Sequence, residues 1–262
     1  MDKRQRIERL AETEEDRILL ARIYDRMTAA AQRNVPGSTC FLSRREQVLA
    51  QRLLPEAALR FFGGYDGAER AVCCCVPDYL TLEDYLLGEN GPVCAVRAAF
   101  YEGDRLTHRD FLGALMGSGV KREAVGDILV QTGRCDLLVT REIAPYILSS
   151  LESAGRTRLH LSPLPLDQVE PPEAQAKTIR DTVAALRLDS VAAAGFGLSR
   201  SKAAAYITGG KAAVNHLPCE KPDRLVAQGD QITVRGLGRL ELAEVGGTTK
   251  KGRNGVVLRR YV

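Results

Sequence analysis

Two cations stand at the start of a short predicted helix. The segment GLSRSKAAAYITGG, residues 197–210, is typical of a helix that begins after Ser199 and ends at two glycines. Its first turn carries Arg200 and Lys202, although the helix dipole already makes that end positive. Free backbone N–H groups there can bind an anion, so the pattern predicts a phosphate site. The alternative is that both cations are simply solvated, and the site requires that the chain's own carboxylates do not bury them.

Other basic residues are predicted to extend this site. Arg187 precedes a first short helix, which Asp189 would cap, and Lys211 follows the second helix. Arg187 would seat an adjacent phosphate, and Lys211 would face the same surface. The track would continue through Lys250, Lys251 and Arg253 in a basic loop, with Arg239 in a predicted hairpin as the weaker candidate.

The charge of the chain is divided unevenly. From Arg180 onward there are 14 Lys and Arg against 7 Asp and Glu, and before it 23 against 26, which gives the net charge of +4. A basic C-terminal third favours a polyanionic partner. No apolar run reaches the roughly 18 residues of a membrane span. The polar start is typical of neither a signal peptide nor a transit peptide, so we expect a cytoplasmic protein that binds no membrane.

The residue types that carry catalysis or bind metals are scarce or scattered. The seven cysteines include no C-x-x-C spacing, and in VCCCV, residues 72–76, alternate thiols of a strand face opposite sides. The three histidines lie in separate segments, and hydrolase, phosphate-loop and zinc-protease motifs are absent from the sequence. We therefore expect no metal, no cofactor and no enzymatic activity.

The pattern of elements predicts an α+β fold in three small domains. Residues 1–76 would form an N-terminal domain of helices and a hairpin, and residues 77–162 a ferredoxin-like β-α-β-β-α-β domain. A proline-rich linker, residues 163–176, would lead to a basic C-terminal domain, residues 177–262. Helix starts are marked by Ser or Thr with an acid three residues later: Thr13 with Asp16, Ser43 with Glu46, and Thr107 with Asp110.

The C-terminal region resembles the RNA-binding domain of small-subunit ribosomal protein four. The resemblance rests on LRLD, then LSRSKAAAYITGGKAAVN and GDQITVRG, and covers residues 186–242. It implies that a helix pair binds RNA, and by position it assigns this role to Arg187, Ser199, Arg200 and Lys202. The sequence departs from the family at Asn215-His216, where many members have Asn-Gly.

The whole chain resembles a narrower group, the YlmH-like proteins. The shared segments, in order, are FFGGYDGAER, GVKREAVGDILV, ALRLD, VRGLGR and TKKGR. This resemblance implies a bacterial protein that binds rRNA and tRNA, acting on large ribosomal subunits with stalled peptidyl-tRNA in quality control. We expect a monomer.

Two other functions compete with this interpretation. Pseudouridine synthases carry a similar RNA-binding domain, and their catalytic motif contains Arg-Leu-Asp, as do residues 187–189. Here the motif continues SVAAAG, and Asp189 already has a predicted role as a helix cap. The second alternative is a cell-division adaptor, which would have no affinity for nucleic acid.

Overall fold

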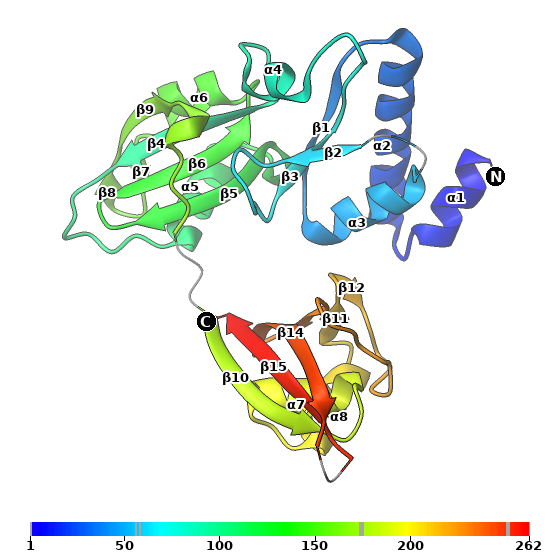
Figure 1. The fold of residues 1–262 in the computed structure, drawn as a ribbon. Coiled ribbons are helices and arrows are strands. Elements are labelled where there is room, and N and C mark those ends of the chain that lie inside the picture. The colour runs from blue at the N-terminus through cyan, green and yellow to red at the C-terminus, as the bar shows by residue number, and fades with distance from the viewer. Residues whose placement is uncertain (1, 56, 58, 173–175, 250–251, 262) are drawn as a thin grey trace. The chain divides into compact units, whose positions relative to one another are not determined.

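The chain forms two compact units, residues 1–172 (unit 1) and 173–262 (unit 2). This computed structural model describes residues 2–55, 57, 59–172, 176–249 and 252–261. Figure 1 shows the elements of both units. The α+β class predicted from the sequence is confirmed, since each unit combines helices with an antiparallel sheet. The predicted division of unit 1 near residue 76 stays a prediction.

The first part of unit 1 places helices beside a small sheet. Three strands pair antiparallel in the order β1-β3-β2, as the predicted hairpin requires. The elements are α1 (Lys3–Leu10), α2 (Glu14–Arg33), β1 (Gly37–Leu42), α3 (Arg44–Leu53), β2 (Arg60–Phe62), β3 (Ala71–Cys75) and α4 (Leu82–Leu87).

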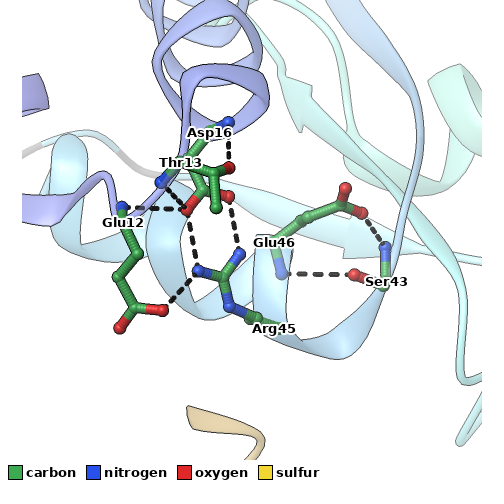
Figure 2. A network of polar contacts seen from close by, with 6 residues as sticks. All are labelled: Glu12, Thr13, Asp16, Ser43, Arg45 and Glu46. Atoms are coloured by element: carbon green, nitrogen blue, oxygen red, sulfur yellow. Dashed lines mark hydrogen bonds and ion pairs between the residues drawn. The ribbon is translucent and has the colours of Figure 1, made fainter. Parts of the chain in front are cut away.

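Capping interactions fix where α2 and α3 begin (Figure 2). Asp16 N donates to Thr13 Oγ1 at 3.2 Å, and Ser43 N donates to Glu46 Oε2 at 2.5 Å, so these two of the three predicted capping boxes are confirmed. Arg45 joins the two helix starts, because its guanidinium donates to both oxygens of Asp16 at 2.6 and 2.8 Å. These hydrogen bonds lower the pKa of the buried Asp16 carboxyl to about 2.

The second part of unit 1 has the predicted β-α-β-β-α-β order. Its strands pair antiparallel as β5-β6-β4-β9, which is the strand order of the ferredoxin-like fold. The elements are β4 (Val93–Ala99), α5 (His108–Gly117), a 3₁₀ turn η1 (Arg122–Ala124), β5 (Val125–Gln131), β6 (Arg134–Thr140), α6 (Ala144–Ser150) and β9 (His160–Leu164). A two-stranded hairpin, β7 (Ser153–Ala154) and β8 (Thr157–Arg158), precedes the last strand.

The structure differs from the predicted linker, residues 163–176, over its first half. Pro163 and Leu164 lie in β9, which pairs with β4 at the edge of the sheet. A 3₁₀ turn, η2 (Leu166–Gln168), follows, and Val169 is buried in unit 1. An edge strand tolerates proline because it needs fewer backbone donors.

One carboxylate joins the two parts of unit 1. Asp127, in β5, accepts hydrogen bonds from Tyr65 Oη at 2.8 Å and from the backbone N–H groups of Glu69 and Arg70 at 2.7 and 3.0 Å. These donors belong to the glycine-rich FFGGYDGAER segment. That segment therefore forms a structural contact with GVKREAVGDILV, the segment that contains Asp127.

Unit 2 packs two helices on one face of a six-stranded antiparallel sheet. The strand order is β10-β15-β14-β13-β11-β12. The elements are β10 (Ala176–Val183), α7 (Leu188–Phe196), α8 (Arg200–Thr208), β11 (Ala212–Val214), β12 (Leu217–Pro218), β13 (Gln231–Val234), β14 (Gly238–Thr248) and β15 (Asn254–Tyr261). The core is apolar and includes Leu188, Ile207, Leu240 and Leu258, which are fully buried.

The departure at Asn215-His216 leaves the turn between β11 and β12 intact. Both residues have positive φ, 49° and 68°, as a tight hairpin turn of this kind requires. The Asn215 side chain stabilises this turn, since its Nδ2 donates to Asp230 Oδ1 at 2.8 Å and its Oδ1 accepts from Gln231 N at 2.9 Å.

We expect Arg45→Gln to lower the free energy of unfolding by about 2 kcal/mol at neutral pH, because it removes a bidentate pair from a buried carboxylate. The pKa of Asp16 is lower in the folded than in the unfolded state. The stabilisation from the Asp16–Arg45 pair is therefore complete above the unfolded-state pKa of ~3.9. It is lost as pH falls through the folded-state pKa of about 2. Urea denaturation at several pH values measures it.

The matched control is Arg17→Gln, which removes an exposed pair with Glu14 and should cost at most ~0.5 kcal/mol. A deficit for Arg45→Gln that stayed constant down to the pH where Asp16 is protonated would contradict this account.

Candidate nucleic-acid interface

The turn between α7 and α8 brings the predicted phosphate site together. Gly197 adopts φ 67° at the end of α7, a left-handed conformation that glycine adopts without strain. Ser199 Oγ then accepts a hydrogen bond from Lys202 N at 3.2 Å, so its predicted role as the cap of α8 is confirmed. The small side chains Ala192 and Ala203 are buried in the same core, which lets the two helices pack closely.

Asp189 is a buried carboxylate and does not cap α7. The prediction that Asp189 caps α7 is wrong, because α7 begins at Leu188 with Arg187 in the cap position. The Asp189 side chain is only 5% exposed. It accepts hydrogen bonds from Arg187 at 3.0 and 3.2 Å, from Arg200 Nε at 3.0 Å and from Ser190 Oγ at 3.1 Å. Two guanidiniums therefore share one acceptor.

The electrostatics of this cluster favour an ionised carboxylate. Burial raises the pKa of Asp189, but the hydrogen bonds from Arg187, Arg200 and Ser190 outweigh it and hold the pKa below its ordinary value. One negative charge faces two positive charges, so the cluster keeps a net positive charge. Its cations stay accessible, since the side chains of Arg187 and Arg200 are 35% and 55% exposed.

A groove of about 400 Å³ opens beside this cluster. Its lining includes Ser190 of α7, Gly197, Arg200 and Arg253, together with residues 181–184 at the end of β10. Thr182 orients Arg253, because its hydroxyl accepts from Arg253 Nε at 2.9 Å and its carbonyl accepts from Arg253 Nη2. The structure therefore brings together Arg200 and Arg253, which are 53 positions apart in the sequence.

The other predicted site residues lie at different places. Lys202 is exposed in the first turn of α8, and Lys211 lies beyond its end, with Nζ 5.4 Å from the centre of the Tyr206 ring. Arg239 lies on the opposite face of the sheet, since its neighbour Leu240 is buried on the helix side. Its guanidinium lies 4.4 Å from the centre of the Tyr261 ring. Lys250 and Lys251 fall outside the described residues.

This arrangement suits an extended anion better than a reacting group. Arginine matches phosphate oxygens with planar, paired donors, and here the guanidiniums are held in place before any ligand binds. The Asp189 oxygens are occupied by four hydrogen bonds and largely buried, which is unfavourable for a nucleophile. Within the described residues, no cluster of His, Cys, Asp or Glu has the geometry to hold a metal ion.

Sequence reasoning missed Thr182 and the role of Asp189. The signal for Asp189 was present in the spacing, because Arg187 lies two residues before it. The partner on α8, Arg200, becomes a neighbour only once the helices pack, and Thr182 meets Arg253 only through the pairing of β10 with β15.

Two family models match the chain. Residues 101–168 match a family described as "Putative RNA-binding domain in YlmH", and residues 186–232 match the S4 domain. The second match contains the helix pair and most of the candidate interface. Among the described residues, no helix is long and apolar enough to cross a membrane.

The chain is also similar to characterised proteins. It is 35% identical over 224 residues to "Ribosome-associated protein quality control protein P2" of Bacillus subtilis (strain 168), covering 85% of this chain and 86% of that protein. Among solved structures it is similar to "Cell division protein ylmH from Streptococcus pneumoniae", with a TM-score of 0.51 and 18% identity. That match covers 61% of this chain and 98% of the other, and it supports the fold alone.

We expect Asp189→Asn to lower the free energy of unfolding of unit 2 by about 1–3 kcal/mol at neutral pH, because two half-exposed guanidiniums lose their shared charge partner. The pKa of Asp189 is lowered in the folded state, so its contribution is present above the unfolded pKa and is lost as the native carboxyl protonates in acid. Chemical denaturation against pH measures it.

Glu244→Gln is the matched control, since it neutralises an exposed carboxylate on β14 of the same unit. Equal effects of the two substitutions at neutral pH would mean that the Asp189 cluster does not stabilise the helix pair.

Proposed function

This chain belongs to the YlmH family, and on that premise we propose that it is a non-enzymatic, cytoplasmic RNA-binding protein that associates with the large ribosomal subunit. Its targets would be structured RNA, rRNA and tRNA, contacted by unit 2. Support comes from the S4 domain match and from the name of the Bacillus subtilis relative, which describes a ribosome-associated quality control protein.

The observation that carries the proposal is the cationic corner at the start of α8. Arg187 and Arg200 are fixed by Asp189, Arg253 is held by Thr182, and Lys202 is exposed beside them. A nucleic-acid backbone presents phosphates in series, and each contact with a cation releases counterions. Recognition would rest on shape and backbone, as is usual for folded RNA.

We propose that the chain acts on large subunits that carry stalled peptidyl-tRNA, because quality control of this kind deals with interrupted synthesis. Ribosomal RNA and tRNA on such a particle would both offer phosphate backbones to unit 2. The chain would act there as a monomer.

The absence of catalysis is part of the same proposal. A pseudouridine synthase of this kind would need the aspartate of its Arg-Leu-Asp motif to reach a nucleotide. In residues 187–189 that carboxylate is buried and hydrogen-bonded to Arg187, Arg200 and Ser190, which supports a structural role.

We expect Arg200→Ala with Lys202→Ala to weaken binding of a structured RNA at least tenfold, because two phosphate contacts are lost. The slope of log affinity against log salt should flatten by roughly 0.7–0.9 per lost contact. The melting temperature should fall only moderately, since Asp189 loses the bond from Arg200 but keeps those from Arg187 and Ser190. Filter binding or fluorescence anisotropy at several salt concentrations measures both affinity and slope.

Two single variants serve as references for this test. Arg17→Gln removes an exposed charge from unit 1, outside both matched RNA-binding domains, and should leave RNA affinity unchanged. Arg239→Ala reports whether the opposite face of the unit 2 sheet also contacts RNA. Unchanged affinity of the double variant, together with a large loss of stability, would refute the proposed interface.

The ribosomal part of the proposal has its own test. Tagged protein should sediment with large subunits in a sucrose gradient, and its crosslinked RNA should include rRNA and tRNA. Binding to isolated RNA without co-sedimentation would keep the RNA-binding proposal and remove the ribosomal one.

A further inference from the structure

A second charged groove lies in unit 1. It has a volume of about 740 Å³ and runs between α2, β1 and the 3₁₀ turn η1. Its floor is apolar: Leu19 of α2 is partly exposed, and Ile23 of α2 with Phe41 and Leu42 of β1 lie almost fully buried behind it. A volume of this size is in the range that holds a small organic ligand.

Two arginines converge at one wall of this groove. Arg70 Nε and Arg122 Nη1 donate to the same carbonyl oxygen, that of Val125, at 2.9 and 2.6 Å. Arg70 Nη2 also donates to the carbonyl of Phe41 at 2.9 Å. Since both guanidiniums bond one oxygen, they lie side by side, and both line the groove. Backbone carbonyls therefore hold two like charges close together.

The charge of this pair is poorly compensated. Within the described residues, neither Arg70 nor Arg122 forms an ion pair with a carboxylate. Burial lowers the pKa of both, and the positive charge of Arg70 lowers that of Arg122 further. The nearby carboxylates Glu46 and Asp127 offset only part of this lowering. Two half-buried guanidiniums in this state gain most from an anion that contacts both.

The carboxylates near the pair are largely occupied. Glu46 accepts from Ser43 N in the capping box shown in Figure 2. Asp25 forms an ion pair with Lys3 at 2.7 Å. Glu123, at the rim, is exposed, and no bond to it is seen within the described part of the chain.

The mouth of the groove adds two further cations. Arg22 and Arg26 are one helical turn apart on α2, both line the groove, and both are exposed. An entering anion would therefore meet positive charge at the mouth before it reaches the buried pair. The groove combines a pair of guanidiniums that can bind an anion, an apolar floor and an exposed carboxylate, Glu123.

We propose that this arginine groove binds a nucleotide, with its phosphate on Arg70 and Arg122 and its base against the apolar floor. The carboxylate of Glu123 would accept a hydrogen bond from an amino group of the base. The nucleotide is either free in solution or an unstacked residue of an RNA strand, because both present the same phosphate and base. The proposal does not depend on the interface in unit 2.

The test uses the full chain carrying Arg200→Ala and Lys202→Ala, so that the unit 2 interface contributes little. One arm titrates guanosine diphosphate with a fluorescent ribose label, and the other titrates a labelled tetranucleotide RNA. We expect saturable binding in at least one arm, and Arg122→Gln should weaken it at least tenfold. Saturation by the free nucleotide identifies that source, and saturation by the RNA alone identifies a strand.

A second variant distinguishes loss of binding from a folding defect, because Arg122 also donates to the backbone carbonyl of Val125. Arg22→Glu with Arg26→Glu alters only exposed side chains and should weaken the same binding at least tenfold without changing the circular dichroism spectrum. Arg17→Gln, on the same helix but outside the groove lining, is the matched control and should leave binding unchanged. Failure of both probes to saturate, or saturation unaffected by the groove variants, would overturn the proposal.

Discussion

The sharing of Asp189 by two guanidiniums is the interaction on which the candidate RNA interface depends. Arg187 precedes α7 and Arg200 begins α8, and without a common acceptor their charges would repel at close range. One buried carboxylate reverses this, because each guanidinium donates to it while leaving part of its surface exposed. The result is a rigid corner with a net positive charge. Such a corner can bind phosphate without first paying the entropy of ordering long side chains.

Unit 1 uses the same principle at three other places. Asp16 binds Arg45 between two helix starts, Asp127 accepts three donors from the glycine-rich segment, and the carbonyl of Val125 gathers Arg70 and Arg122. In the first two, hydrogen bonds from the protein's own donors occupy a carboxylate. In the third, the acceptor is neutral, so the positive charge of both arginines remains available. Positive charge also remains at Asp189, where one carboxylate faces two guanidiniums.

Local signals predicted the local structure well, and tertiary contacts explain the rest. Capping boxes such as Thr13 with Asp16 depend on residues three apart, so a sequence displays them directly. The local sequence predicts that Asp189 is a helix cap, because its partner Arg200 lies on the next helix. The prolines of residues 163–176 predict an extended linker, yet Pro163 and Leu164 are extended inside an edge strand. The sequence shows two cations at the start of α8, but the fixed geometry of Arg200 depends on packing against α7.

The central claim is that RNA backbone lies against the corner formed by Arg187, Arg200 and Arg253. Photo-crosslinking of the full chain to ribosomal particles, followed by mass spectrometry of the crosslinked peptides, tests it most directly. The account predicts crosslinks within residues 187–202 and at Arg253. Efficient crosslinking to RNA elsewhere in unit 2, with both of these segments unmodified, would contradict it.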